Sequence, residues 1–196
     1  MISRTHDVMS IGKVNNLHNH SIMSFLESLK FEPACLLDLD VIDHLEQTSY
    51  HPDEAATREK LKNRIEYAAH SGPELFLVAK DKETIVGFVC TTLSRSDLLT
   101  EESMDVHDPE GKTVCLHSVC VAPEYRKRGV ATHLLNTWIG ILRHHNELQT
   151  PKKYERVAIL SRPNLLSLYG SVGFKNLGKS EVVHGPEPWY DCILEL

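Results

Sequence analysis

The feature that most constrains the fold is a strand, turn and helix between residues 113 and 146. Residues 113–121 are rich in β-branched and apolar side chains and predict a strand, and Pro123 marks the turn after it. The stripe of apolar residues that follows comprises Val130, Leu134, Leu135, Trp138, Ile141 and Leu142. Their helical spacing predicts an amphipathic helix over about 127–146. A strand that runs into such a helix is a building unit of α/β folds.

Periodicity and turn residues predict the remaining elements. Helices are expected over about 35–47, where Leu37, Val41 and Leu45 recur at four-residue spacing, from Pro52-Asp53 to Gly72-Pro73, and over 163–170. Strands are expected over 75–79, 84–93, 156–160, 173–178 and 188–195. The order β-α-α-β-β-β-α-β-α-β-β predicts one α/β domain over residues 25–196 with a mixed sheet. Residues 1–24 show no periodicity, so they are expected to form a flexible N-terminal extension.

Composition excludes several classes of protein. The 196 residues include 21 Lys+Arg and 27 Asp+Glu, a net charge of −6 without a long run of one sign, which disfavours a nucleic-acid partner. No apolar run approaches the about 18 to 20 residues of a membrane span, and residues 1–20 do not resemble a secretory signal. Five cysteines without a CxxC pair argue against disulfides and a zinc ribbon. We therefore expect a cytoplasmic protein without a metal.

The loop before the long helix carries the basic run Arg126-Lys127-Arg128-Gly129. Free N–H groups and the positive end of the helix dipole make the start of a helix a site for anions. Gly129 permits close approach of the backbone, and the small Ala131 leaves room, so a pyrophosphate would fit. The alternative interpretation is a solvated turn whose charges are incidental.

Two motifs together resemble a known family. Arg126-x-x-Gly129-x-Ala131, at the start of a helix after a strand, resembles the acetyl-CoA pyrophosphate loop of the GCN5-related N-acetyltransferase (GNAT) superfamily. Residues 163–174 resemble its second signature, a helix with a Tyr just before a Gly-Phe strand entry. Residues 99–103, 115–121 and 168–174 resemble more narrowly the arylalkylamine (serotonin) N-acetyltransferase branch and its fungal polyamine-acetylating relatives. The resemblance covers about residues 31–196.

The resemblance implies a single GNAT-type α/β domain. Its sheet would be mixed and mostly antiparallel, with two central parallel strands, about 113–121 and 154–160, that splay apart, and with helices on both faces. Acetyl-CoA would be the co-substrate. The splay would expose the backbone of Val119, Cys120 and Val121 to its pantetheine arm. The pyrophosphate would be held by Lys127, Arg128, Gly129, Val130, Ala131 and Thr132.

The difficult step for such an enzyme is to deliver a neutral amine, because an alkylamine is neutral in only about one molecule in 2,500 at pH 7. His117 is the candidate proton acceptor, with water as a relay and an apolar pocket to lower the pKa of the amine. By the resemblance, Tyr169 would protonate the departing thiolate, and a backbone N–H near Val119 would face the oxyanion. The alternative interpretation makes His117 and Tyr169 core residues.

Cys115 stands where the arylalkylamine branch has the first of two histidines, which weakens a two-histidine relay. It is either a small packing residue or, less in keeping with its neighbours, a nucleophile without an activating partner. Strand alternation predicts Cys115, His117 and Val119 on one face and Ser118 on the other.

The resemblance places Tyr50, Pro52 and Trp189 in the wall that holds an aromatic amine. Acidic residues offer an alternative, because they would attract a polyamine: Asp53, Glu54, Glu101, Glu102, Asp105, Glu187 and Asp191. A third possibility is a non-catalytic module that binds acetyl-CoA. The expected partner is a small amine, and the expected state is a monomer or a weak dimer.

Overall fold

The computed structural model describes residues 20–182 and 187–196. The strands are β1 (Lys30–Pro33), β2 (Phe76–Asp81), β3 (Thr84–Ser94), β4 (Thr113–Val121), β5 (Arg156–Ser161), β6 (Lys175–Lys179) and β7 (Tyr190–Glu195). The helices are α2 (Leu39–Ser49), α3 (Arg58–Ser71), α4 (Glu101–Asp105), α5 (Val130–Glu147) and α6 (Leu166–Ser171), and residues 20–28 are also helical. Most of the extension predicted over residues 1–24 lies outside the described residues, and residues 20–24 belong to this first helix.

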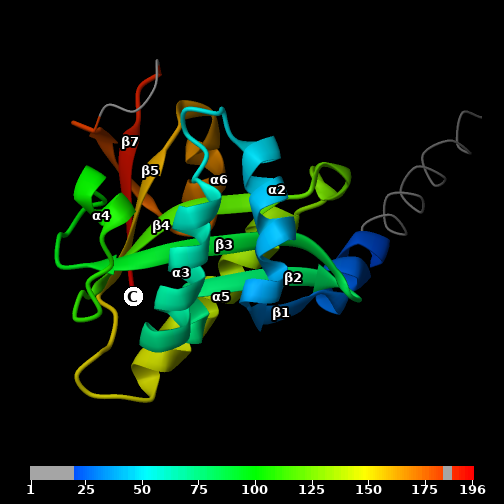
Figure 1. Ribbon diagram of the computed structural model, residues 1–196, viewed down its shortest axis with the longest axis horizontal. Coiled ribbons are helices and arrows are strands. Elements are labelled where there is room, and N and C mark those ends of the chain that lie inside the picture. The colour runs from blue at the N-terminus through cyan, green and yellow to red at the C-terminus, as the bar shows by residue number, and fades with distance from the viewer. Residues whose placement is uncertain (1–19, 183–186) are drawn as a thin grey trace, which may run out of the picture.

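Seven strands form one mixed sheet in the order β1-β2-β3-β4-β5-β7-β6. All neighbours are antiparallel except β4 and β5, which are parallel. The parallel register begins with Thr113 beside Arg156 and ends with Leu116 beside Ile159, although both strands continue. Figure 1 shows β5 turning away from β4. The predicted α/β domain with two splayed central strands is therefore confirmed.

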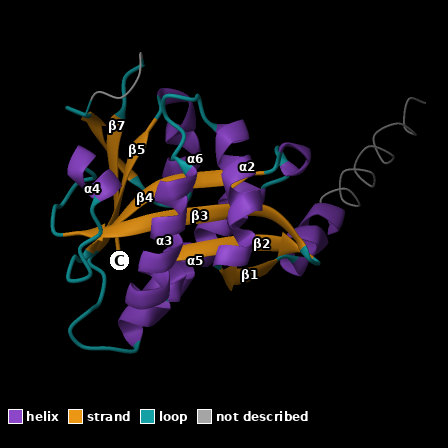
Figure 2. Ribbon diagram, viewed as in Figure 1, coloured by secondary structure: helices purple, strands orange, loops and turns teal. Residues whose placement is uncertain are grey.

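Helices cover both faces of the sheet. Figures 1 and 2 show α2 and α3 in front of the strands and α5 behind them. Trp138, on the apolar stripe of α5, is completely buried. The indole N–H of Trp138 donates to the backbone oxygen of Glu74 at 3.0 Å. Ile139 is buried in the stripe, whereas Ile141 is only partly buried. No helix among the residues described is both long and apolar enough to cross a bilayer.

The front helices differ from the expectation in two respects. Leu37 lies in a 3-10 turn before α2 and is exposed, as is Val41, whereas Ile42 and Leu45 are the residues of α2 that are buried. The second helix begins at Arg58 rather than at Pro52-Asp53, and Thr57 caps it by accepting the Lys60 N–H. Residues 50–57 therefore form a loop, and this loop borders the site described below.

Candidate active site

His117 is brought to the site by an irregularity in β4. The register pairs Cys90 with Ser118 and Thr91 with Leu116, so His117 has no partner on β3. A bulge of this kind re-aims side chains and often lies next to an active site. His117 and Ser118, although adjacent, line the same pocket. The predicted alternation, which separated these two residues, is therefore wrong at this point.

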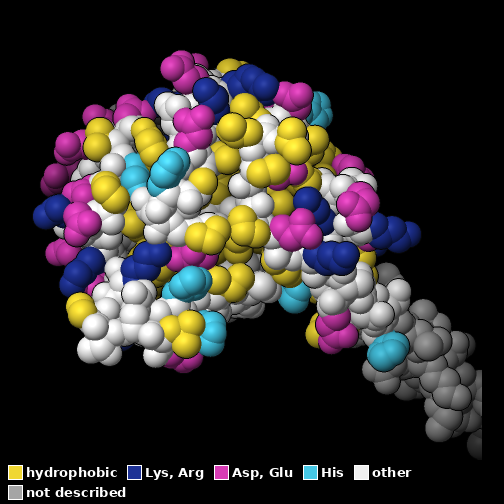
Figure 3. All heavy atoms as spheres, turned by 60° about the horizontal axis from the view of Figure 1, so that its bottom comes forward, with side chains coloured by type: hydrophobic (Ala, Val, Ile, Leu, Met, Phe, Trp, Pro, Cys, Tyr) yellow, Lys and Arg dark blue, Asp and Glu magenta, His cyan; other side chains and the backbone are white. Residues whose placement is uncertain are grey.

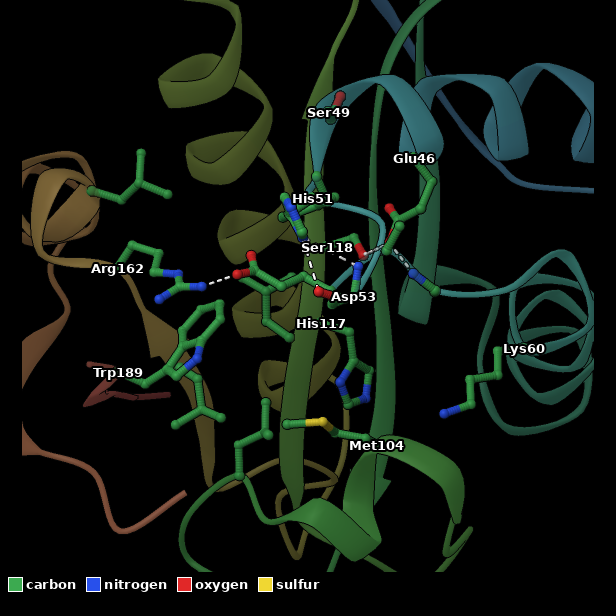
Figure 4. Close-up of a pocket in the computed structure, with 18 of the residues that line it drawn as sticks. Glu46, Ser49, His51, Asp53, Lys60, Met104, His117, Ser118, Arg162 and Trp189 are labelled. Carbon is green, nitrogen blue, oxygen red and sulfur yellow. Dashed lines mark hydrogen bonds and ion pairs between the residues drawn. The ribbon is translucent and has the colours of Figure 1, made fainter. Parts of the chain in front are cut away.

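A pocket of about 380 Å³ lies beside the divergence of β4 and β5. Its walls come from α2 and the loop after it, the start of α3, the α4 segment, β4, and the end of β5 with α6. Figure 4 shows His117 and Met104 close together at one end, with Trp189 and Arg162 on one side and Lys60 on the other. The volume suits a small organic molecule.

His117 is partly buried and oriented by a hydrogen bond. Its Nε2 lies 2.8 Å from the hydroxyl of Thr92. Burial lowers the pKa of His117 well below its ordinary value, and the positive charges of Arg64 and Lys60 lower it further. Arg64 is 5% exposed and donates to the backbone oxygen of Met104 at 3.0 Å. The imidazole is therefore neutral at physiological pH and able to accept a proton.

A buried carboxylate, Glu46 on α2, forms another wall of the pocket. Its Oε1 accepts the N–H of Ala56 at 2.9 Å and the hydroxyl of Ser118 at 3.0 Å, and the Cys120 thiol donates to Oε2 at 3.4 Å. Burial raises the pKa of Glu46, although these hydrogen bonds oppose the rise. Glu46 thus ties α2 and the loop over the pocket to β4.

Tyr50 lies in the gap between the diverging strands. Its hydroxyl accepts the backbone N–H of Val119 at 3.1 Å and lies 3.5 Å from the oxygen of the same residue. The backbone oxygen of Val121 accepts a hydrogen bond from Nε–H of Arg126 at 2.9 Å. Of the three residues whose backbone the splay was expected to expose, Val119 and Val121 therefore each have a backbone group engaged by a side chain.

Tyr169 and Cys115 differ in their relation to the pocket. Tyr169 lines it, and its ring packs edge-on against Phe174 at 5.6 Å between centroids. Burial raises the pKa of Tyr169, so its hydroxyl stays protonated. Cys115 is fully buried with Leu99 and Ala158 and does not line the pocket, and burial raises the pKa of its thiol to about 11. This environment favours the packing interpretation of Cys115 over a nucleophile.

The rim opposite α3 is closed by charged and aromatic side chains. Arg162 and Glu54 form an ion pair in which each side chain is 12% exposed. The guanidinium of Arg162 also lies 4.0 Å from the centre of the Trp189 ring. Of the three residues expected in the wall, Trp189 and Tyr50 line the pocket, whereas Pro52 is exposed and lies outside it. The predicted contribution of Pro52 to the wall is therefore not supported.

A second cavity, of about 230 Å³, lies at the N-terminus of α5. It is lined by Val121, Tyr125, Arg126, Lys127, Gly129, Val130, Ala131 and Thr132. Gly129 has φ 82° and precedes the first helical residue, so the N–H groups of the first turn lack helical partners. Lys127 also has a positive φ, of 58°. These residues form the turn that the sequence predicted as an anion site.

The two arginines of this turn are held by neighbours. The guanidinium of Arg126 donates to the hydroxyl of Ser49 at 3.1 Å. The guanidinium of Arg128 lies 4.5 Å from the centre of the Phe25 ring and 5.5 Å from that of Tyr125. Arg126 thus braces the turn against α2, in addition to adding positive charge to it.

Four charged residues of the pocket were not identified in the sequence: Glu46, Lys60, Arg64 and Arg162. Glu46 and Arg64 stand on the buried stripes of α2 and α3, beside Ile42 and Ile65. A charge on an apolar stripe is unusual unless it is paired or functional, so this pattern could have marked both residues. Arg162, directly after β5, carries no comparable signal in the sequence.

The fold is similar to solved acyltransferase-like structures. The GphF GNAT-like decarboxylase in complex with isobutyryl-CoA superposes with a TM-score of 0.69 at 19% identity, covering 85% of this chain and 98% of that one. A spermidine N-acetyltransferase SpeG chimera from Vibrio cholerae and hSSAT gives a TM-score of 0.56 at 15% identity, covering 86% and 95%. At these identities the likeness shows the fold alone.

Sequence comparison identifies the family. Serotonin N-acetyltransferase of Mesocricetus auratus is 29% identical over 113 residues, which are 58% of this chain and 52% of that protein, so the match spans about half of the relative's length. The pattern of the Acetyltransferase (GNAT) family matches residues 39–174, a range that contains His117, Tyr169 and the turn before α5. The chain therefore belongs to the acetyltransferase (GNAT) family.

Proposed function

We propose that this protein transfers the acetyl group of acetyl-CoA to the primary amine of a small arylalkylamine, of the tryptamine or serotonin type, by direct attack in a ternary complex. The observation that carries the proposal is the neutral His117 in a pocket beside the diverging strands. The partial match to hamster serotonin N-acetyltransferase supports the substrate class.

The cavity at α5 is the site we assign to the diphosphate of acetyl-CoA. Unpaired N–H groups at a helix N-terminus attract phosphate, and Gly129 has no Cβ to stand in its way. Lys127 adds positive charge, and the backbone of Val119 and Val121 leads from there toward His117. When bound, acetyl-CoA supplies an already activated acyl group.

His117 removes the proton of the attacking amine, directly or through water. The imidazole stays neutral because burial and Arg64 disfavour its charged form. The same burial disfavours the ammonium form of the substrate, so the difference in pKa that opposes the transfer becomes smaller. The hydroxyl of Tyr169, which burial keeps protonated, donates a proton to the departing thiolate, and the proton that His117 took from the amine returns to Tyr169 through water, so that both groups regain their starting forms.

The walls favour an aromatic amine over a polyamine. Tyr50 and Trp189 supply aromatic surface. Two acidic residues expected to attract a polycation are neutralised, since Glu54 pairs with Arg162 and Asp105 pairs with Lys60. On the face shown in Figure 3, acidic and basic side chains are interspersed rather than gathered by sign. The pocket therefore offers a polyamine fewer uncompensated carboxylates than the sequence suggested, with Asp53 remaining beside His51.

The test is amine-dependent release of thiol from acetyl-CoA, corrected for hydrolysis. Tryptamine should give higher kcat/KM than spermidine, and His117→Gln should lower it by about 100-fold or more. His70→Gln, on the exposed part of α3, is the matched control and should retain activity. Higher turnover of spermidine would assign the polyamine alternative. Binding of acetyl-CoA without release of thiol for any amine would assign a non-catalytic module.

A further inference from the structure

The hydrogen bonds around Thr92 determine which nitrogen of His117 carries the proton. Thr92 lies on β3 and is 1% exposed. Its Oγ1 is 2.8 Å from the backbone oxygen of Ser103 and 2.8 Å from Nε2 of His117. A hydroxyl has one proton to donate, and a carbonyl oxygen can only accept. The Thr92 proton therefore points to Ser103, and the His117 contact must be a bond that Nε2–H donates to Thr92.

We infer that Thr92 is a positioning residue that holds neutral His117 as its Nε2–H tautomer and leaves Nδ1 as the nitrogen that accepts the proton. This inference rests on the proposed function. In the opposite tautomer, the lone pair of Nε2 would face Oγ1 of Thr92, whose only proton is already donated to the backbone oxygen of Ser103. In the described part of the chain, Nδ1 of His117 makes no hydrogen bond, and His117 lines the pocket. Nδ1 is thus available to an amine or a bridging water.

The carbonyl that orients Thr92 is itself fixed. Ser103 belongs to the short helix α4, and its N–H donates to Oγ1 of Thr100 at 3.2 Å. The Ser103 hydroxyl accepts the N–H of Thr100 at 2.9 Å and donates to the Thr100 oxygen at 2.8 Å. The segment between β3 and β4, which contains α4, therefore orients His117 indirectly: it fixes the carbonyl of Ser103, which accepts the proton of Thr92.

The test compares Thr92→Val with Thr92→Ser, which keeps the hydroxyl. Thr91→Val is a matched control, because Thr91 is equally buried and its hydroxyl donates to the backbone oxygen of Leu75 at 2.6 Å. Nitrogen NMR of the full chain with labelled histidine distinguishes the two tautomers, and the His117 signals are assigned by their loss in His117→Gln. The wild type, Thr92→Ser and Thr91→Val should show protonated Nε2 and unprotonated Nδ1 for His117.

In Thr92→Val the spectrum should show protonation redistributed toward Nδ1, and kcat for tryptamine should fall by about tenfold to 100-fold. Thr92→Ser and Thr91→Val should stay within about threefold of the wild type, because neither removes the acceptor of Nε2–H. A wild-type His117 protonated on Nδ1, or unchanged tautomer and kcat in Thr92→Val, would overturn the inference. The spectra need no substrate, so the assignment of the tautomer remains testable even if the proposed amine fails.

Discussion

The hydroxyl of Tyr50 accepts the backbone N–H of Val119 at 3.1 Å, within the gap where β5 leaves β4. Burial raises the pKa of Tyr50 well above its ordinary value, so the phenol is neutral there. The N–H that the family resemblance places opposite the oxyanion is therefore already in use. Acetyl-CoA must displace this hydroxyl before its thioester can bind to Val119.

Tyr50→Phe should consequently bind acetyl-CoA more tightly. The substitution keeps the aromatic wall but removes the group that competes for the Val119 N–H. One net hydrogen bond contributes about 1 kcal/mol, which corresponds to a roughly fivefold lower Kd. Titration calorimetry with acetyl-CoA measures the change.

Tyr67→Phe provides the control for this substitution. Tyr67 stacks on His107 at 4.9 Å between ring centroids and lines neither cavity. Its Kd should equal that of the wild type. Weaker binding in Tyr50→Phe alone would mean that the phenol contacts the bound thioester instead of competing with it.

The sequence predicted the sheet well because each strand carries a local pattern. β4 begins and ends where its apolar run does, and Asp81 and Thr84 bound the hairpin as the turn residues between them suggested. The start of α3 was predicted too early. The helix starts after Thr57, which caps it, and the loop before Thr57 is held by the long-range bond between Glu46 and the Ala56 N–H, which no local pattern reveals.

The site was only partly predictable for the same reason. Motifs identified His117, Tyr169 and the turn at Gly129, since their spacing along the chain is fixed by the strand and helices that carry them. The bulge at His117 shifts the register by one residue and cannot be read from alternation. The Arg162 and Glu54 pair joins segments more than a hundred residues apart, so only the folded chain brings it together.

Two glycines at α5 should respond to alanine in opposite ways. Gly129 has φ 82°, and a Cβ there would meet only Leu26, at 3.4 Å, so the cost comes from the backbone conformation. Gly129→Ala should lower the free energy of unfolding by about 1 kcal/mol and weaken binding of CoA. Gly140 has open space and lies in the interior of α5, so Gly140→Ala should raise that free energy by about 0.5 to 1 kcal/mol. Urea unfolding and calorimetry measure both quantities, and equal losses in the two variants would contradict the assignment.

Removing the charge of Arg64 should move the pH profile of the enzyme. Burial and the positive charge of Arg64 lower the pKa of His117, so kcat/KM should decline only below the ordinary range of histidine. Arg64→Met should raise the pKa of His117 and shift the acidic limb to higher pH. Arg58→Met, in the exposed first turn of α3, is the control and should leave the limb in place. An unchanged limb in Arg64→Met would assign that ionisation to another group.

The same substitution should change the pH dependence of stability. Because the pKa of His117 is lowered on folding, the unfolded chain binds more protons between the folded and unfolded pKa values. The contribution of His117 to stability is therefore present above about pH 6.5 and is lost as the pH falls below it. Urea unfolding at about pH 7 and at about pH 5 measures this loss. The free energy of unfolding should fall less between the two pH values in Arg64→Met than in Arg58→Met.

Arg162 should decide between aromatic and polycationic amines. It neutralises Glu54 and covers the ring of Trp189, so its loss would leave an uncompensated carboxylate beside the pocket. Arg162→Met keeps an apolar chain against the ring but removes the charge. The ratio of kcat/KM for spermidine to that for tryptamine should therefore rise, by about tenfold if the freed carboxylate gains one charge-assisted hydrogen bond. Arg156→Met, at the start of β5 and paired with Asp97 outside the pocket, should leave the ratio unchanged. If both variants leave the ratio at the wild-type value while remaining folded, the ion pair holds the loop after α2 without selecting the amine.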